Sequence, residues 1–337
     1  MVQLPVHSAV RFYPQRLAGA PAPDGVLSER FLRQTVLNKS KPAIITLDRI
    51  LSYGELARDA RSLAAHLRRL GVGHETPVGV LLAPGIEHIT AQAAVILAGG
   101  SVVPLDVSLP DERLAAMLRQ WRVLFTLTDA PCRERALDTR LIILEDIAVG
   151  DGNDSDFMPQ PTSLPQRTHL LVTAQTGRPA SRELDAHGLV GQVINRRHVR
   201  VNPDDRVGCI AAATGCAYQL EVWGALLNGA AAVVLPQNIV RDASRLTAAL
   251  AQFAISILFI SAALFNQMAR RYPDAFRGLQ YLLVEGDGLD DASLTRVMQH
   301  GAPRHVLNGR PAAGNAARSL YHEIPFAGAA AHRARPS

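Results

Sequence analysis

Cysteine and lysine are both scarce in this 337-residue sequence. The three cysteines, Cys132, Cys209 and Cys216, are odd in number and widely spaced, which argues against a disulfide framework and against a metal-binding knuckle. We expect them to be small apolar side chains in the core. Lys39 and Lys41 are the only lysines, so the sequence offers no lysine for chemistry after position 41, although arginine is abundant.

Long apolar runs and dense charge are also missing. The longest apolar stretch, Leu250 to Phe265, contains polar residues and is too short to cross a bilayer as a helix. The first residues, MVQLPVHSAVRFYPQRL, lack the features of a secretion signal. The net charge of +5 comes from arginines spread along the chain rather than from a basic run. We therefore expect a cytoplasmic protein whose partners are neither membranes nor nucleic acids.

The length and composition of the sequence are those of two compact globular units. Hydrophobic residues make up 48% and charged residues 19%, which is typical of folded, soluble chains. A polar stretch with several prolines, DGNDSDFMPQPTSLPQ, is typical of a linker. We expect a leader at 1–26, a first α/β subdomain at 27–150, the linker at 151–166, a second α/β subdomain at 167–322 and a frayed tail at 323–337.

Helix-like and strand-like segments alternate along both units. Apolar residues spaced alternately by four and three predict a helix that begins near Leu56 and stops at Gly71-Val72-Gly73. Apolar runs predict strands at 77–83, 101–105, 123–128, 141–144, 169–173, 207–213, 231–235, 256–260, 280–285 and 304–307. Between them we expect helices at 86–98, 111–120, 184–197, 219–228, 243–253, 262–271 and 291–300. This alternation predicts an α/β fold with parallel sheets covered by helices.

Four stretches together resemble a known family. They are LSYGEL at Leu51 to Leu56, LAGGSVVPLDVSLPDERL at Leu97 to Leu114, EVWGALLNG at Glu221 to Gly229, and the turn Thr176-Gly177-Arg178-Pro179. In order and spacing they resemble the adenylate-forming (AMP-binding) enzymes, most closely the amino-acid adenylation domains of nonribosomal peptide synthetases. The resemblance implies two doubly wound α/β subdomains of the family's N-terminal domain. We expect the family's β-barrel end and its mobile C-terminal domain to be lacking.

The turn around Thr176 is the counterpart of the family's phosphate-binding loop, T-S-G-S-T-G-x-P-K-G. Small hydroxyl residues and glycines let that loop wrap a pyrophosphate, and its lysine adds a positive charge. Aligned on Thr176-Gly177, this sequence has Ala174 and Gln175 for a glycine and a serine, and Ala180 and Ser181 for the lysine and the last glycine. If Thr173 is instead matched to the first threonine, the loop is one residue short. Either alignment loses the phosphate cradle.

The remaining family sites are partly kept. Cys216 stands where the resemblance places an aspartate that grips the substrate's amino group. A thiol cannot replace a carboxylate there, so the substrate class has changed or the constraint is gone. Gly286-Asp287-Gly288-Leu289 resembles the segment beside the adenine, and Asn308-Gly309 opens the next motif. Where that motif continues Y-G-P-T-E, however, this sequence has RPAAG, which lacks the adenine-packing tyrosine and the magnesium-binding glutamate.

These comparisons predict vestigial sites and no catalytic or metal-binding residue. The predicted nucleotide cleft contains Thr173, Thr176, Gly177, Gly286, Asp287 and Asn308, and Cys216 marks the predicted substrate pocket. Our first hypothesis is a non-catalytic homologue with an accessory or scaffold role, partnered by peptide-synthetase or carrier-protein components. The second is an ATP- and Mg²⁺-dependent adenylating subunit completed by a partner chain, and the third is a decaying gene product. No cofactor is expected unless the second hypothesis holds.

Overall fold

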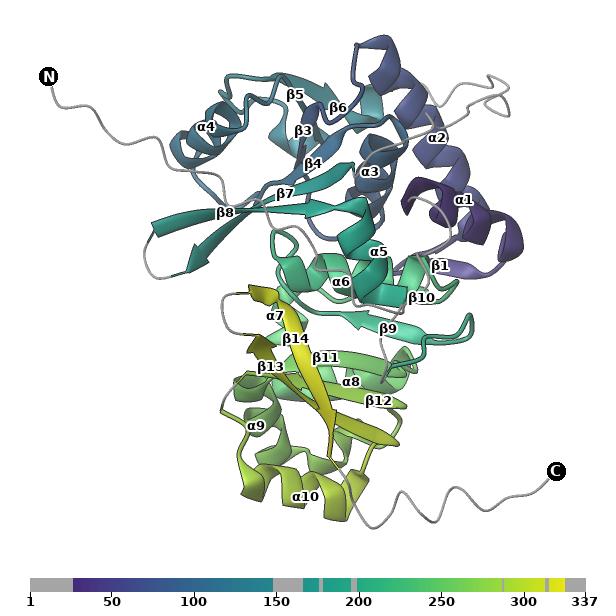
Figure 1. Cartoon of the computed structure of the whole chain (residues 1–337), viewed down its shortest axis with the longest axis vertical. Coiled ribbons are helices and arrows are strands. Elements are labelled where there is room, and N and C mark those ends of the chain that lie inside the picture. The colour runs from purple at the N-terminus through teal and green to yellow at the C-terminus, as the bar shows by residue number, and fades with distance from the viewer. Residues whose placement is uncertain are drawn as a thin grey trace, which may run out of the picture.

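A computed structural model describes residues 27–147, 166–175, 178–194, 199–286, 288–312 and 315–324. It contains two largely parallel β-sheets with helices on both faces, which confirms the predicted α/β class. Figure 1 shows the sheet of β3 to β8 above and the strands from β9 onward below, with α5 and α6 between them. No helix in the described ranges is long and apolar enough to span a membrane.

The first sheet has six strands in the order β6-β5-β3-β4-β7-β8, and only β8 is antiparallel to its neighbour. Its strands are β3 (Pro77–Leu81), β4 (Ser101–Pro104), β5 (Phe125–Thr128), β6 (Arg140–Ile143), β7 (Arg167–Gln175) and β8 (Arg178–Asp185). Helix α3 (Ile86–Leu97) packs with Val78 and Val80 of β3, whereas α4 (Asp111–Gln120) packs with Leu81 and Val103. Alternating strand residues therefore bury both faces.

The second sheet has eight strands in the order β14-β13-β12-β11-β9-β10-β1-β2, with antiparallel strands only at the two edges. Its strands are β1 (Pro42–Ile45), β2 (Ile50–Ser52), β9 (Arg206–Cys209), β10 (Ala231–Val234), β11 (Ile257–Ser261), β12 (Tyr281–Glu285), β13 (His305–Ala312) and β14 (Asn315–Glu323). One face packs on α6 (Cys216–Leu226). The other packs on α8 (Ala243–Gln252), α9 (Ala262–Arg271) and α10 (Asp291–Gly301).

The remaining helices connect or cover these layers. They are α1 (Leu27–Leu37), α2 (Tyr53–Arg69), α5 (Ala186–Ile194), α7 (Gln237–Val240) and three short 3₁₀ turns. The LSYGEL stretch forms the start of α2: the Ser52 hydroxyl accepts the Glu55 N–H, and the Glu55 carboxylate accepts the Ser52 N–H at 2.8 Å. This reciprocal capping fixes where the helix begins. At its other end Gly71 takes a φ of 90°, as the predicted stop requires.

The two sheets do not follow the predicted division of the chain at 151–166. Strands β1 and β2, from the first predicted unit, complete the second sheet, because Ile44 and Ile45 pair with Ala232 and Val233 of β10. Strands β7 and β8, from the second predicted unit, complete the first sheet. The sheets thus exchange strands across the linker, most of which lies outside the described residues, as does the leader. The predicted tail begins within β14, and its residues from 325 onward are likewise not described.

Candidate functional site

The switch point of the eight-stranded sheet is the natural place for a ligand. From β9 the chain crosses to β10 through α6 on one face, and from β10 it returns to β11 through α7 and α8 on the other. Ligands of doubly wound folds bind in the crevice outside the carboxyl ends of the strands at such a point. The segments that follow β9, β11 and β12 all lie along this edge.

Gly286 and Asn308-Gly309, which the sequence predicts in one cleft, do lie side by side. Gly286 follows β12 directly, has a φ of 111°, and donates its N–H to the Gly309 carbonyl at 3.1 Å. A side chain at Gly286 would be strained at this φ. Leu307 packs in the cluster under α6, so the alternation of β13 places Asn308 on the opposite face. The predicted Asp287 lies outside the described residues.

A residue that sequence reasoning missed holds the segment after Gly286 in place. Asn266 of α9, which is 9% exposed, donates its side-chain N–H to the Gly288 carbonyl at 2.7 Å and accepts the Asp290 N–H at 3.2 Å. Its two bonds span the turn that leads into α10. No local pattern distinguishes this asparagine from others in helices, so the sequence carried no signal for its role.

Cys216 is the first residue of α6 and is half-buried, beside the loop that leads out of β9. Glu221, one helical turn further on, braces this loop by accepting the Ala211 N–H at 3.2 Å. Burial raises the pKa of the Glu221 carboxyl well above its usual range, opposed by hydrogen bonds from the Ala211 and Ile210 backbone and reinforced by the charge of Glu285. The raised pKa favours the neutral acid, and the buried side chain acts as an internal brace of the loop.

The cysteines only partly match expectation. Cys209, the last residue of β9, is buried, and burial raises the pKa of its thiol well above the usual range. Cys132 and Cys216 are half-buried. In the described part of the chain no group of three or more His, Cys, Asp or Glu residues could hold a metal ion.

The predicted phosphate turn belongs to the other sheet. Thr173 lies in β7 and pairs with Ala180 of β8, and the ladder continues to the pair Gln175 and Arg178. Thr176 and Gly177 lie outside the described residues, but this pairing leaves only two residues to connect the strands. On both sides of these two residues the backbone is therefore paired as strands, and such pairing engages groups that a phosphate-binding loop would present to its ligand.

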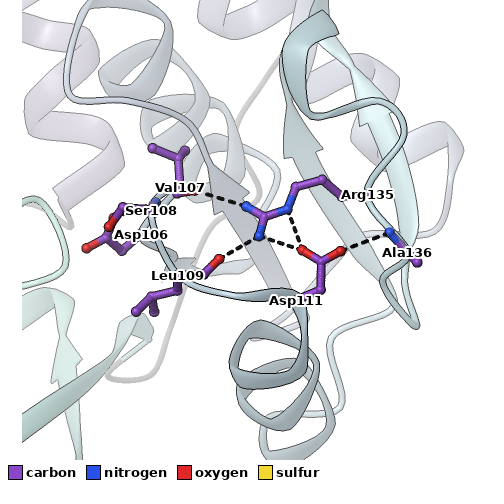
Figure 2. Close-up of polar contacts among 7 residues, drawn as sticks. All are labelled: Asp106, Val107, Ser108, Leu109, Asp111, Arg135 and Ala136. Carbon is purple, nitrogen blue, oxygen red and sulfur yellow. Dashed lines mark hydrogen bonds and ion pairs between the residues drawn. The ribbon is translucent and has the colours of Figure 1, made fainter.

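The VPLDVSLPDERL stretch forms a loop after β4 that one arginine holds in shape (Figure 2). Arg135 donates to the Asp111 carboxylate at 2.6 Å, to the Val107 carbonyl at 3.0 Å and to the Leu109 carbonyl at 2.5 Å. Within the loop, Asp106 accepts the N–H and hydroxyl of Ser108 at 2.9 and 2.7 Å. Arg135 lies 24 residues from Asp111 in the sequence, too far for any motif to connect them.

We predict that Arg135→Ala destabilises the protein by about 2 kcal/mol, because it leaves two carbonyls and a carboxylate without their charged donor. Arg133→Ala is the matched control: Arg133 also forms a two-point pair, with Asp146 at 2.7 Å, but both side chains are about half exposed. Exposed pairs contribute little, so this variant should cost less than about 1 kcal/mol. Urea unfolding of both variants measures the difference, and equal costs would contradict the role assigned to Arg135.

Together the topology and the edge segments define an α/β protein of the doubly wound type, a fold whose ligands bind at the switch point. The chain belongs to the AMP-binding enzyme family, whose model matches residues 31–309. It is 32% identical over 271 residues to the nonribosomal peptide synthetase asaC of Aspergillus flavus, covering 79% of this chain and 26% of that protein. It is 28% identical over 263 residues to gramicidin S synthase 2 of Brevibacillus brevis, covering 78% and 6%.

Solved structures agree with this assignment at the level of the fold. The nonribosomal peptide synthetase FmoA3, bound to alpha-methyl-L-serine-AMP, has a TM-score of 0.81 at 23% identity, covering 91% of this chain and 35% of that one. The N-terminal subdomain of NpsA from Klebsiella oxytoca, in complex with 3-hydroxybenzoyl-AMSN, has a TM-score of 0.78 at 19% identity, covering 90% and 76%. The chain spans about a quarter of the length of curated relatives such as asaC.

Proposed function

We propose that this chain is a non-catalytic homologue of a peptide-synthetase adenylation domain, with an accessory or scaffold role in that kind of biosynthesis. One observation carries the proposal: the pairing of Gln175 with Arg178 leaves two residues where an adenylating enzyme needs a loop that wraps the phosphates. Membership of the AMP-binding family and the similarity to peptide synthetases support the biosynthetic setting. Peptide-synthetase or carrier-protein components would be its partners.

The scale of the losses supports a role without catalysis. Removing one oriented donor from a transition state costs about 3 kcal/mol. A glycine and a serine of the phosphate cradle, its lysine, its last glycine and the magnesium-binding glutamate that the resemblance would require are replaced in this sequence. Four or more such losses remove most of a rate enhancement that is worth about 8 to 23 kcal/mol in typical enzymes.

The nucleoside side of the crevice is better kept than the phosphate side. Gly286 and Gly309 are held together by a backbone hydrogen bond, and Asn266 fixes the segment between Gly288 and Asp290. Binding that depends on this side alone gains nothing from a triphosphate. We therefore expect a weak nucleoside site that does not favour ATP.

We predict that ATP·Mg²⁺ binds no more than about threefold tighter than adenosine, since each tenfold in affinity needs 1.4 kcal/mol of added contact. Calorimetric titration with adenosine, AMP and ATP·Mg²⁺ measures the ratio, and pyrophosphate exchange over an amino-acid panel should stay at background. Substrate-dependent exchange by the isolated chain would sink the proposal. A strong preference for ATP would contradict the lost cradle, and no binding of any nucleoside would contradict a surviving cleft.

A second candidate is a divergent adenylating subunit that a partner chain completes. The Gly286–Gly309 hydrogen bond favours it, because two segments that the resemblance places beside the nucleotide still lie together. Its test is pyrophosphate exchange after addition of a separately produced C-terminal adenylation subdomain that carries a lysine. Exchange only in that mixture would support the second candidate and contradict the first.

A further inference from the structure

A buried chain of hydrogen bonds lies between the two sheets, away from the crevice. On α3, Gln92 lies 3.2 Å from Nδ1 of His88 and, through its other amide atom, 3.1 Å from Nε2 of His169 on β7. His169 Nδ1 in turn lies 3.0 Å from the Thr168 hydroxyl, which donates to the Leu184 carbonyl of β8 at 3.1 Å. His88, Gln92 and His169 are fully buried.

Counting protons fixes the direction of this chain. The Thr168 hydroxyl has one hydrogen, which it gives to Leu184, so it must accept a proton from Nδ1 of His169. Burial lowers the pKa of His169 to about 3, so the ring is neutral and its Nε2 accepts. The Gln92 amide must then present its NH₂ to His169 and its oxygen to His88, which a half-turn of the amide allows. While Thr168 donates to Leu184, the opposite orientation leaves Nδ1 of His169 without a hydrogen.

The same count determines which nitrogen of His88, at the other end of the hydrogen-bond series, carries the proton. With the Gln92 oxygen facing it, His88 carries its proton on Nδ1, and its Nε2 is a bare acceptor. In the described structure this Nε2 is buried without a hydrogen-bond partner, and so is the hydroxyl of Tyr218 on α6. The two rings meet edge-on, with centroids 5.6 Å apart. The ring that carries the unsatisfied acceptor therefore packs against the ring that carries the unsatisfied hydroxyl.

We propose that Tyr218 and His88 share one buried water molecule, which accepts the tyrosine hydroxyl proton and donates to His88 Nε2. Such a water satisfies two groups whose isolation would otherwise be costly, as buried waters in proteins commonly do. The completed relay runs from α6 through α3 to β7 and β8, so it joins helices and strands of both sheets.

The tautomer of His88 tests the direction of the relay. Nitrogen-15 chemical shifts of the imidazole rings, recorded on the full-length protein at pH 7, distinguish a proton on Nδ1 from one on Nε2. We expect Nδ1 protonation for both His88 and His169. A proton on Nε2 of His88 would overturn the proposal, because that nitrogen could no longer accept from the water.

Two further measurements test the water itself. A high-resolution crystal structure should show one ordered water within hydrogen-bond distance of both His88 Nε2 and the Tyr218 hydroxyl. A direct bond between the two groups, or no density for a water, would overturn the proposal.

In solution, Tyr218→Phe should lower Tm by roughly 2 to 4 °C, and by less in a His88→Leu background. Tyr53→Phe is the control, because the Tyr53 hydroxyl donates to the Ala230 carbonyl at 2.7 Å and its loss should cost the same in both backgrounds. Additive effects for Tyr218 would overturn the proposal.

Discussion

Acidification from pH 7 to pH 4.5 is expected to lower the free energy of unfolding by about 5 kcal/mol through the titration of His88 and His169. Burial lowers the pKa of His88 to about 4, and burial together with the nearby His88 lowers that of His169 to about 3. Both rings titrate near pH 6.5 when the chain unfolds. Below that value the unfolded chain binds protons that the folded chain refuses, so stability falls as the pH falls.

The groups that face the two rings do not complicate the pH dependence that the histidines produce. His88 meets Gln92 and Tyr218, and His169 meets Thr168, Gln92 and the Trp223 ring, so the described neighbours supply no carboxylate to either histidine. Glu221 works in the opposite direction, because its raised pKa makes the folded state gain stability on acidification.

The measurement must therefore separate the histidines from the rest of the protein. Unfolding free energies of the wild type and of a His88→Leu/His169→Leu variant, compared from pH 7 to pH 4.5, isolate their contribution. The difference between the two proteins should shrink by about 5 kcal/mol over this range. A difference that does not change with pH would contradict the prediction, as would histidine ring signals that titrate near pH 6.5 in the folded protein.

Glu221→Leu is expected to cost about 3 kcal/mol, whereas Glu221→Gln should leave the protein at least as stable as the wild type at pH 7. The leucine removes the acceptor for the Ala211 and Ile210 N–H groups, which stay buried and unsatisfied. Glutamine keeps an acceptor oxygen of the same shape. Glutamine also removes an effect that destabilises the wild type. Above pH 4.5 the wild-type carboxyl ionises in the unfolded chain, whereas its raised pKa favours the neutral form in the folded chain, and this difference favours unfolding.

The pH dependence distinguishes this brace from an ordinary ionised glutamate. The advantage of Glu221→Gln over the wild type should fade as the pH is lowered through 4.5, because both unfolded chains are then neutral at this position. Glu134→Gln, at an exposed site, should change the stability by less than about 0.5 kcal/mol. If Glu221→Gln is instead as damaging as Glu221→Leu at pH 7, the buried carboxyl is ionised and the assignment is wrong.

Most regular elements could be predicted because their signals are local. The helix from Tyr53 to Arg69 was predicted from its apolar spacing, with a start near Leu56, and the helices predicted at 111–120 and 262–271 have those bounds in the structure. The sequence did not predict strand β8. Its residues Arg178 to Asp185 are mostly polar, and the strand is defined by its pairing with β7. The helix predicted to start at 184 therefore starts at Ala186.

The residues that shape the candidate site were harder to find. Arg135, Asn266 and Glu221 each hold a loop from a different element, and their hydrogen bonds depend on distances that only folding creates. The structure brings only some of the residues of the predicted cleft together. Gly286 and Gly309 meet, whereas alternation sends Asn308 to the face opposite α6, and Thr173 belongs to the other sheet.

By itself the sequence determined the class of fold, the position of most helices and strands, and the replacement of the residues that adenylation chemistry would use. Hydrophobic periodicity and helix caps act over a few residues, and a missing lysine or glutamate needs no coordinates to be noticed. Only the tertiary structure decided that β1 and β2 join the second sheet and that β7 and β8 join the first. It also decided which buried polar groups meet. Both depend on pairing between segments far apart in the chain, where burial and register set the outcome.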